Sequence, residues 1–152
     1  MRCSVRLEHE PLDPERALRD LLISPAGAGA VVSFVGLVRQ NGADGPIQEL
    51  VLEHHPTLTE GSLKAIAEEA LLRFELERVS ILHRCGSLRA GEPIVFVAAA
   101  SQHRRAAFDA VDFMMDRLKT DAVFWKREEG PDGRRWIEPA AGDYEARERW
   151  GS

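Results

Sequence analysis

Cysteine, lysine and long apolar runs are all scarce in this 152-residue sequence. The two cysteines, Cys3 and Cys85, form no C-x-x-C pair, which argues against a disulfide framework or a structural zinc site and fits a reducing cytoplasm. No apolar run approaches the roughly 20 residues that span a bilayer. Residues 1–10 also lack the apolar core of a signal peptide. We therefore expect one cytoplasmic domain over residues 1–152, with no membrane partner.

Lysine is rare among the basic residues. Only Lys64, Lys119 and Lys126 are lysines, whereas the chain has 20 basic residues in all. Arginine stays protonated in proteins, but a lysine amine can act as a nucleophile or exchange a proton. Lys119 and Lys126 lie seven residues apart, so this pair is a candidate for chemistry. The alternative is a compositional preference for arginine, which suffices for Lys64.

The formal net charge of −5 argues against a general nucleic-acid binder that uses a basic surface. The charge is uneven, because residues 83–127 hold 8 basic and 5 acidic side chains and add His83 and His103. A locally basic stretch in an acidic protein suggests a site for a small anion or a carboxylate tail. The alternative is a solvated face with scattered charges.

Apolar periodicity predicts an α+β fold in which strands occur in adjacent pairs and much of the sheet is antiparallel. Helices are expected from Pro14 after an Asp13 N-cap, after a Thr57-x-x-Glu60 capping box, and over 104–120. The third helix should turn Phe108 and Met114 inward, with Met115 either in the core or in a pocket wall. Turns are expected at 24–27, 39–46, 88–92 and 130–133, and the charged tail 139–152 should be mobile unless it docks. Strands are expected at 4–7, 30–38, 47–55, 79–82, 94–100, 122–128 and 135–138.

Several common sites are missing. The run Gly27-Ala28-Gly29-Ala30 precedes a strand rather than a helix, so it is no phosphate-binding loop. His54 and His55 are neighbours on a strand and should point to opposite faces, so no metal site is expected. His103 and Arg104 begin the third helix, where backbone N–H groups favour anions. Lys119 lies about 22 Å further along that helix at 1.5 Å per residue.

Several motifs together carry a family resemblance. The strand from Gly29 to Arg39, with sequence GAVVSFVGLVR, is followed in order by LEHHP, HRCG, SQHRRAAF and MDRLKT running into FWKRE. In their order and spacing these blocks resemble the large, catalytic subunit of molybdopterin synthase. The resemblance covers nearly the whole chain from about residue 29, and its last two blocks are highly specific.

This resemblance implies an α/β hammerhead-type domain with an additional antiparallel β subdomain. It also implies a sulfurtransferase that inserts two sulfurs into cyclic pyranopterin monophosphate and so forms the dithiolene of molybdopterin. The sulfur would come from the thiocarboxylated Gly-Gly terminus of a small ubiquitin-like partner subunit, so no cofactor is expected. Two large subunits would form a central homodimer within a heterotetramer.

The resemblance also assigns site residues. Lys119, Lys126 and Arg39 correspond to the catalytic residues, and Phe34 and Met115 to walls of the pocket. No metal ligand is implied. Substrate-binding positions correspond to Leu37, Val38, Arg39, His103, Arg104, Lys119, Lys126, Arg127 and Glu128.

Four positions depart from the family pattern. Asp121 and Val123 stand where relatives often have a basic residue and a proline, and His55 stands where tyrosine is common. Ala140 stands where relatives can carry an arginine that reaches the neighbouring subunit's site; Arg134, Arg135 or Arg147 are alternatives for that contact. These departures motivate a second hypothesis, a non-catalytic module that binds a Gly-Gly tail or a small anion.

Overall fold

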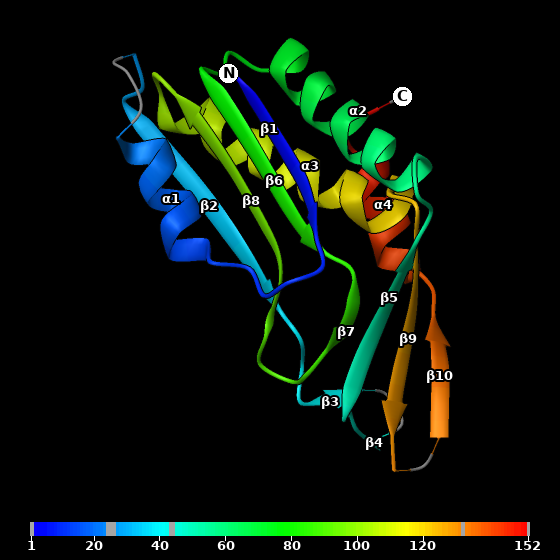
Figure 1. Ribbon diagram of the computed structural model, residues 1–152. Coiled ribbons are helices and arrows are strands. Elements are labelled where there is room, and N and C mark those ends of the chain that lie inside the picture. Colours follow the sequence, from blue (N-terminus) through cyan, green and yellow to red (C-terminus); the bar gives the residue numbers. More distant parts are fainter. Residues whose placement is uncertain (1, 24–26, 43–44, 132, 152) are drawn as a thin grey trace.

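The computed structural model describes residues 2–23, 27–42, 45–131 and 133–151. Its first sheet has four strands in the order β1-β6-β8-β2 (Figure 1). The β1–β6 pair is parallel, and the β6–β8 and β8–β2 pairs are antiparallel. The strands are β1 (Cys3–Glu8), β2 (Ala30–Leu37), β6 (Arg78–Arg84) and β8 (Pro93–Ser101).

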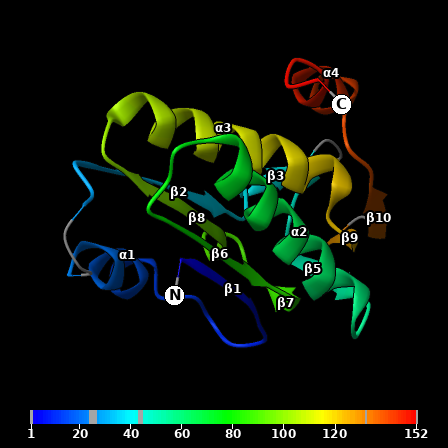
Figure 2. The ribbon, with the colours of Figure 1, turned by 90° about the horizontal axis from the view of Figure 1, so that it is seen from above.

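Helices cover both faces of this sheet. Helix α1 (Pro14–Leu22) lies on one face, and α2 (Leu58–Arg73) and α3 (Arg104–Asp121) lie on the other (Figure 2). Strand β8 serves both layers because successive side chains alternate between faces. Phe96 packs in one cluster with Leu21 of α1, whereas Val97 packs in the main core with α2 and α3. The main core therefore lies between the sheet and the α2–α3 layer.

A second sheet extends below the first, with strand order β10-β9-β5-β7 and only antiparallel pairs. It has its own small core, which includes Val38, Ile47 and Leu52. The expected α+β fold with an additional antiparallel sheet is thus confirmed. Its strands are β5 (Glu49–His54), β7 (Gly86–Leu88), β9 (Phe124–Gly130) and β10 (Gly133–Ile137), and a separate two-stranded hairpin is formed by β3 (Asn41–Gly42) and β4 (Gly45–Pro46).

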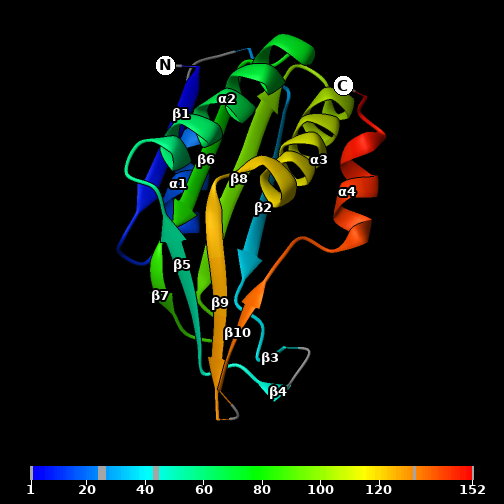
Figure 3. The same ribbon diagram turned by 90° about the vertical axis from the view of Figure 1, so that its right-hand side faces the viewer.

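The C-terminal tail docks rather than staying loose. Residues Ala141–Glu148 form helix α4, which lies beside α3 (Figure 3). Beyond it, the Trp150 ring packs edge-on against Phe74 and Phe113 at centroid distances of 5.9 and 5.6 Å. The Trp150 indole N–H donates to the Asp116 carboxylate at 2.6 Å. An aromatic side chain past the last helix therefore anchors the tail to the main core.

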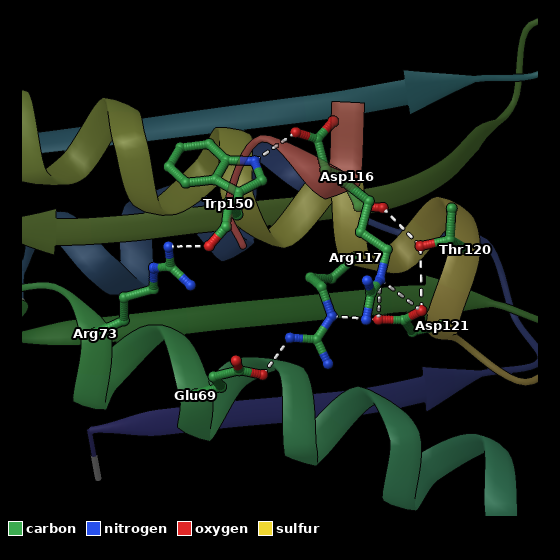
Figure 4. Close-up of polar contacts among 8 residues, drawn as sticks. Glu69, Arg73, Asp116, Arg117, Thr120, Asp121 and Trp150 are labelled. Carbon is green, nitrogen blue, oxygen red and sulfur yellow. Dashed lines mark hydrogen bonds and ion pairs between the residues drawn. The ribbon is translucent and has the colours of Figure 1, made fainter. Parts of the chain in front are cut away.

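An ion-pair network centred on Asp121 joins α2, α3 and α4 (Figure 4). The Asp121 carboxylate accepts from the Arg117 guanidinium and, at 3.0 Å, from Arg147 Nε. Arg117 also donates to Glu69 of α2. Although burial opposes it, the hydrogen bonds from Arg147 and Arg117 leave the pKa of Asp121 below its usual value. Asp121, a departure from the family pattern, is therefore a structural anchor for the tail.

Three sequence-based expectations need correction. Thr57 is the N-cap of α2 but makes no side-chain cap bond; His55 Nδ1 accepts from the Thr57 and Leu58 N–H groups at 3.2 and 3.1 Å instead. Phe108 is not a core residue, because 54% of it is exposed. The turns expected at 39–46 and 88–92 contain the β3–β4 hairpin and the end of β7. Parts of three expected turns, residues 24–26, 43–44 and 132, lie outside the described residues.

Candidate functional site

Lys119 and Lys126 are brought together where α3 ends and β9 begins. Lys119 is exposed in the last turn of α3, and Lys126 is partly buried in β9. Burial first, and then the positive charge of Lys119, lower the pKa of Lys126 from 10.5 to about 8, while Asp143 of α4 opposes the shift. The two ammonium groups are thus close enough to repel each other, and the docked tail contributes a counter-charge.

His83 is a third member of this site, since the charges of both lysines act on it, and it belongs to the basic stretch 83–127 without a role expected from the sequence. It is buried in β6, and its ring stacks on Phe124 with 4.1 Å between centroids. Burial chiefly, with the charges of Lys126 and Lys119 adding to it, lowers the pKa of His83 to about 3. The ring is therefore neutral at physiological pH, and its Nδ1–H donates to the Arg84 carbonyl at 2.8 Å. The sequence feature that could have indicated this buried position is a histidine that follows the apolar strand residues 79–82.

The connection from α3 to β9 is fixed by α2. Thr59 is fully buried, and its hydroxyl donates to the Val123 carbonyl at 2.5 Å. The Val123 N–H donates to the Ser62 hydroxyl at 3.1 Å. A proline at position 123 would remove that N–H. Val123 therefore contributes a hydrogen bond that ties the α3–β9 connection to α2.

Arg127 is held away from the lysine pair, whereas Glu128 lies two residues beyond Lys126 on the same face of β9. Arg127 alternates with Lys126 along β9 and so points to the opposite face of the strand. There its guanidinium pairs with Glu53 at 2.8 Å and lies over the Trp136 ring. Glu128 lies at the β3–β4 hairpin, where a Cβ added to Gly42 would be 2.7 Å from its carboxylate oxygens. A cavity of about 70 Å³ beside Glu128 is lined by neither lysine.

Arg39 and its neighbours mark the passage between the two sheets. Phe34 and Leu37 lie on the edge strand β2 and are 41% and 54% exposed. Val38 is buried in the small core, and its N–H donates to the Glu92 carbonyl at 2.9 Å. Arg39 follows as an exposed side chain. This segment therefore presents apolar groups and one cation beside a sheet edge.

His103 and Arg104 lie at the far end of α3 from Lys119. Both are exposed at the helix N-terminus. Fifteen residues at 1.5 Å each separate Arg104 from Lys119 by about 22 Å along the axis, so one small ligand cannot touch both ends within one chain. Met115, expected in the core or in a pocket wall, is partly buried against the main core.

Ala140 is exposed at the N-terminus of α4. Its backbone N–H donates to the Asp143 carboxylate at 2.9 Å. Arg147 does not take the place of the arginine that the family resemblance leads us to expect at position 140, because its guanidinium is bound to Asp121. Arg134 and Arg135 belong to β10 and lie within 3.8 and 3.5 Å of Glu129 and Glu128. The tail thus reaches the lysine site through the acidic Asp143.

Chemically, the site combines an amine whose pKa is near 8, a second ammonium and a neutral imidazole. Such an amine exchanges protons readily near neutral pH, because the ideal catalytic pKa lies close to the working pH. The adjacent ammonium favours an anionic ligand.

No helix of the described residues is long and apolar enough to cross a bilayer.

Known proteins resemble the chain over most of its length. The profile described as MoaE protein matches residues 7–121. A molybdopterin synthase catalytic subunit from Pseudomonas aeruginosa is 48% identical over 147 residues, which are 97% of this chain and 98% of that protein. The corresponding subunit from Caulobacter vibrioides is 44% identical over 96% of both chains.

Solved structures agree with these matches. The molybdopterin biosynthesis MoaE protein from Burkholderia ambifaria superposes with a TM-score of 0.84 at 38% identity, covering 99% of both chains. The molybdopterin synthase from Staphylococcus aureus superposes with a TM-score of 0.79 at 29% identity, covering 86% of this chain and 94% of that one. Sequence and fold together show that the chain belongs to the MoaE protein family, whose relatives here are catalytic subunits of molybdopterin synthase.

Proposed function

We propose that this chain is a sulfurtransferase subunit that moves two sulfurs onto cyclic pyranopterin monophosphate, forming the dithiolene of molybdopterin. The sulfurs arrive on the thiocarboxylated Gly-Gly terminus of a small ubiquitin-like partner, so the chain itself needs no cofactor. The observation that carries the proposal is the convergence of Lys119 with the partly buried Lys126, whose pKa is lowered. Two free cysteines, Cys3 and Cys85, fit a cytoplasmic setting.

The two lysines divide the work. Lys119, exposed at the end of α3, attracts the anionic thiocarboxylate and stabilises negative charge that develops as sulfur is transferred. Lys126, with a pKa near 8, is mostly protonated at pH 7 and donates a proton to the departing oxygen. His83, neutral and stacked on Phe124, shapes the wall beside them without adding a charge. Arg39, exposed just after β2, takes the role that the family resemblance gives it, which is to guide the anionic groups into the site.

The phosphate is held by cations from a second copy of the chain. His103 and Arg104 lie about 22 Å along α3 from Lys119, so within a homodimer they serve the partner's site rather than their own. The exposed apolar side chains of the edge strand β2, Phe34, Val35 and Leu37, support such self-association, because unpaired strand edges and grouped apolar groups favour protein contacts.

The test is reconstitution from purified components. The chain, its thiocarboxylated partner and cyclic pyranopterin monophosphate are mixed, and molybdopterin is measured after oxidation to its fluorescent derivative. Molybdopterin formation is expected, together with conversion of the partner's terminus to a carboxylate. Tight partner binding without any sulfurated product would instead favour the alternative, a non-catalytic module for a Gly-Gly tail or a small anion.

Complementation tests the shared site. Lys119→Ala and His103→Ala chains are each inactive as homodimers if both residues act in catalysis. A mixed dimer keeps one site with Lys119 from one chain and His103 from the other, so mixing is expected to restore activity to that site. No recovery, with mixed dimers demonstrated by mass, would contradict the assignment of His103 to the neighbouring copy.

A further inference from the structure

Three soft metal-ligating side chains meet at the junction of the two sheets. His9 follows β1, His54 ends β5, and Cys85 joins β6 to β7 (Figure 1). Their ligand atoms all lie within 4.8 Å of one another. Cys85 Sγ lies 3.3 Å from His9 Nδ1 and 3.6 Å from His9 Nε2, and the rings of His9 and His54 meet edge-on at 5.3 Å.

These spacings approach those of a tetrahedral zinc site. Zn–S bonds of ~2.3 Å and Zn–N bonds of ~2.0 Å at tetrahedral angles put ligand atoms roughly 3.3–3.6 Å apart. The Cys85–His9 separation already has that value. The separations that involve His54 are at most 4.8 Å, so they need side-chain rotations of the partly exposed His54 ring and the exposed His9 ring to reach that value. Two imidazoles and one thiolate are also the donor set that zinc prefers.

The surrounding charges can accommodate a cation. The buried guanidinium of Arg84 acts electrostatically on Cys85, and it is paired with Glu92 at 3.3 Å. The Cys85 thiol is directed to the Glu8 carbonyl at 3.6 Å, and a bound divalent ion displaces the thiol proton. His9 is exposed while Cys85 is buried, so the ion has an entry path from solvent and one ligand fixed in the core.

We propose that His9, His54 and Cys85 bind a zinc ion, with a fourth position open to water. The ligands come from both four-stranded sheets or their immediate flanks, so the ion links the end of β1 and the β6–β7 junction to β5. The expectation of no metal rested on the lack of a C-x-x-C pair and on His54 considered only beside His55. His55 is instead occupied in capping α2, and the other two ligands are 45 and 31 residues from His54 in sequence.

This site is distinct from the lysine site and does not rest on the proposed function. Its test uses the purified full chain, first stripped with a chelator, then titrated with Zn²⁺ against a chromophoric competitor. Co²⁺ serves as a spectroscopic probe, because a thiolate ligand gives a charge-transfer absorption. The variants are His9→Gln, at an exposed position that should not impair folding, and Cys85→Ser, with Cys3→Ser as the matched thiol control.

One equivalent of Zn²⁺ per chain is expected to bind. His9→Gln should weaken it by at least about tenfold, and Cys85→Ser should abolish the Co²⁺ charge-transfer band, while Cys3→Ser leaves both unchanged. Zn²⁺ should also raise the unfolding temperature of the wild type but not of His9→Gln. The proposal is overturned if no saturable binding occurs at one equivalent, or if His9→Gln binds Zn²⁺ as tightly as the wild type.

Discussion

Replacing Lys126 by methionine should stabilise the protein. The folded state lowers the pKa of this amine from 10.5 to about 8, chiefly by burial and then by repulsion from Lys119. Each pKa unit corresponds to about 1.4 kcal/mol, so the charged amine costs the folded state about 3 kcal/mol at pH 7. Methionine fills a similar volume without a charge. Lys126→Met is therefore expected to raise the free energy of unfolding by about 3 kcal/mol, or the midpoint by roughly 10 °C.

The sign of the pH dependence makes the test sharper. Between pH 8 and 10.5 the unfolded chain binds more protons at Lys126 than the folded chain does, so wild-type stability rises through that window. The penalty is fully present below pH 8 and absent above 10.5. The advantage of Lys126→Met should therefore shrink from about 3 kcal/mol at pH 7 to roughly 1.4 kcal/mol at pH 9.5.

Urea unfolding at both pH values, followed by tryptophan fluorescence, measures this difference. Lys64→Met is the matched control, because Lys64 is exposed and pairs with Glu60 at 3.2 Å in the same helix; its effect should stay below about 0.5 kcal/mol. A Lys126→Met protein no more stable than the wild type at pH 7, or one with a gain independent of pH, would refute the reasoning.

Three further changes have defined outcomes. Since the pKa of His83 falls from 6.5 to about 3 on folding, chiefly by burial, wild-type stability should drop by roughly 2 kcal/mol between pH 7 and pH 5; His83→Gln should flatten this slope in urea unfolding. Trp150→Ala should cost about 2 kcal/mol by opening the tail contact with the core, against less than about 1 kcal/mol for the half-exposed Trp136→Ala. Asp121→Arg should cost about 2 kcal/mol, because Arg147 loses its partner and faces a like charge; hydrogen exchange should then be faster in α4.

Most of the fold follows from local patterns that the sequence carries openly. The apolar run from Ile94 to Ala100 predicts the buried strand. The apolar stripe that includes Met114 predicts the third helix, because burial selects side chains at the period of each element. Asp13 before Pro14 predicts the start of α1, and the Asp13 carboxylate does accept from the Arg16 N–H at 3.1 Å. These elements depend on residues near one another in the chain.

The missed features depend on contacts between distant residues. Helix α4 forms a docked tail because Trp150 and Arg147 find Phe113 and Asp121, which nothing within residues 139–152 reveals. His55 caps α2 because its ring folds back onto the helix N-terminus and accepts from the Thr57 and Leu58 N–H groups. It takes the place of the Thr57 hydroxyl, which was expected to be the cap.

The functional site, too, depends partly on contacts between residues that are distant in the sequence. The scarcity of lysine marks Lys119 and Lys126 as candidates for chemistry, and the family resemblance gives them and Arg39 catalytic roles, which remain proposals. The sequence could not show that His83 lies beside the lysines, because that position depends on how β6 packs against β9. Nor could the sequence show that His9, His54 and Cys85 lie close together, since this depends on how the two sheets pack against each other in the folded chain.

The central claim, that the lysine pair carries out sulfur transfer, is tested most directly by single-turnover sulfuration with Lys119→Ala. The variant is mixed with excess thiocarboxylated partner and with cyclic pyranopterin monophosphate, and its affinity for the partner is measured separately. Lys64→Ala serves as the control and should form molybdopterin at the wild-type rate. We expect Lys119→Ala to bind the partner but to form no dithiolene, and turnover at the wild-type rate would show that Lys119 is not needed for sulfur transfer.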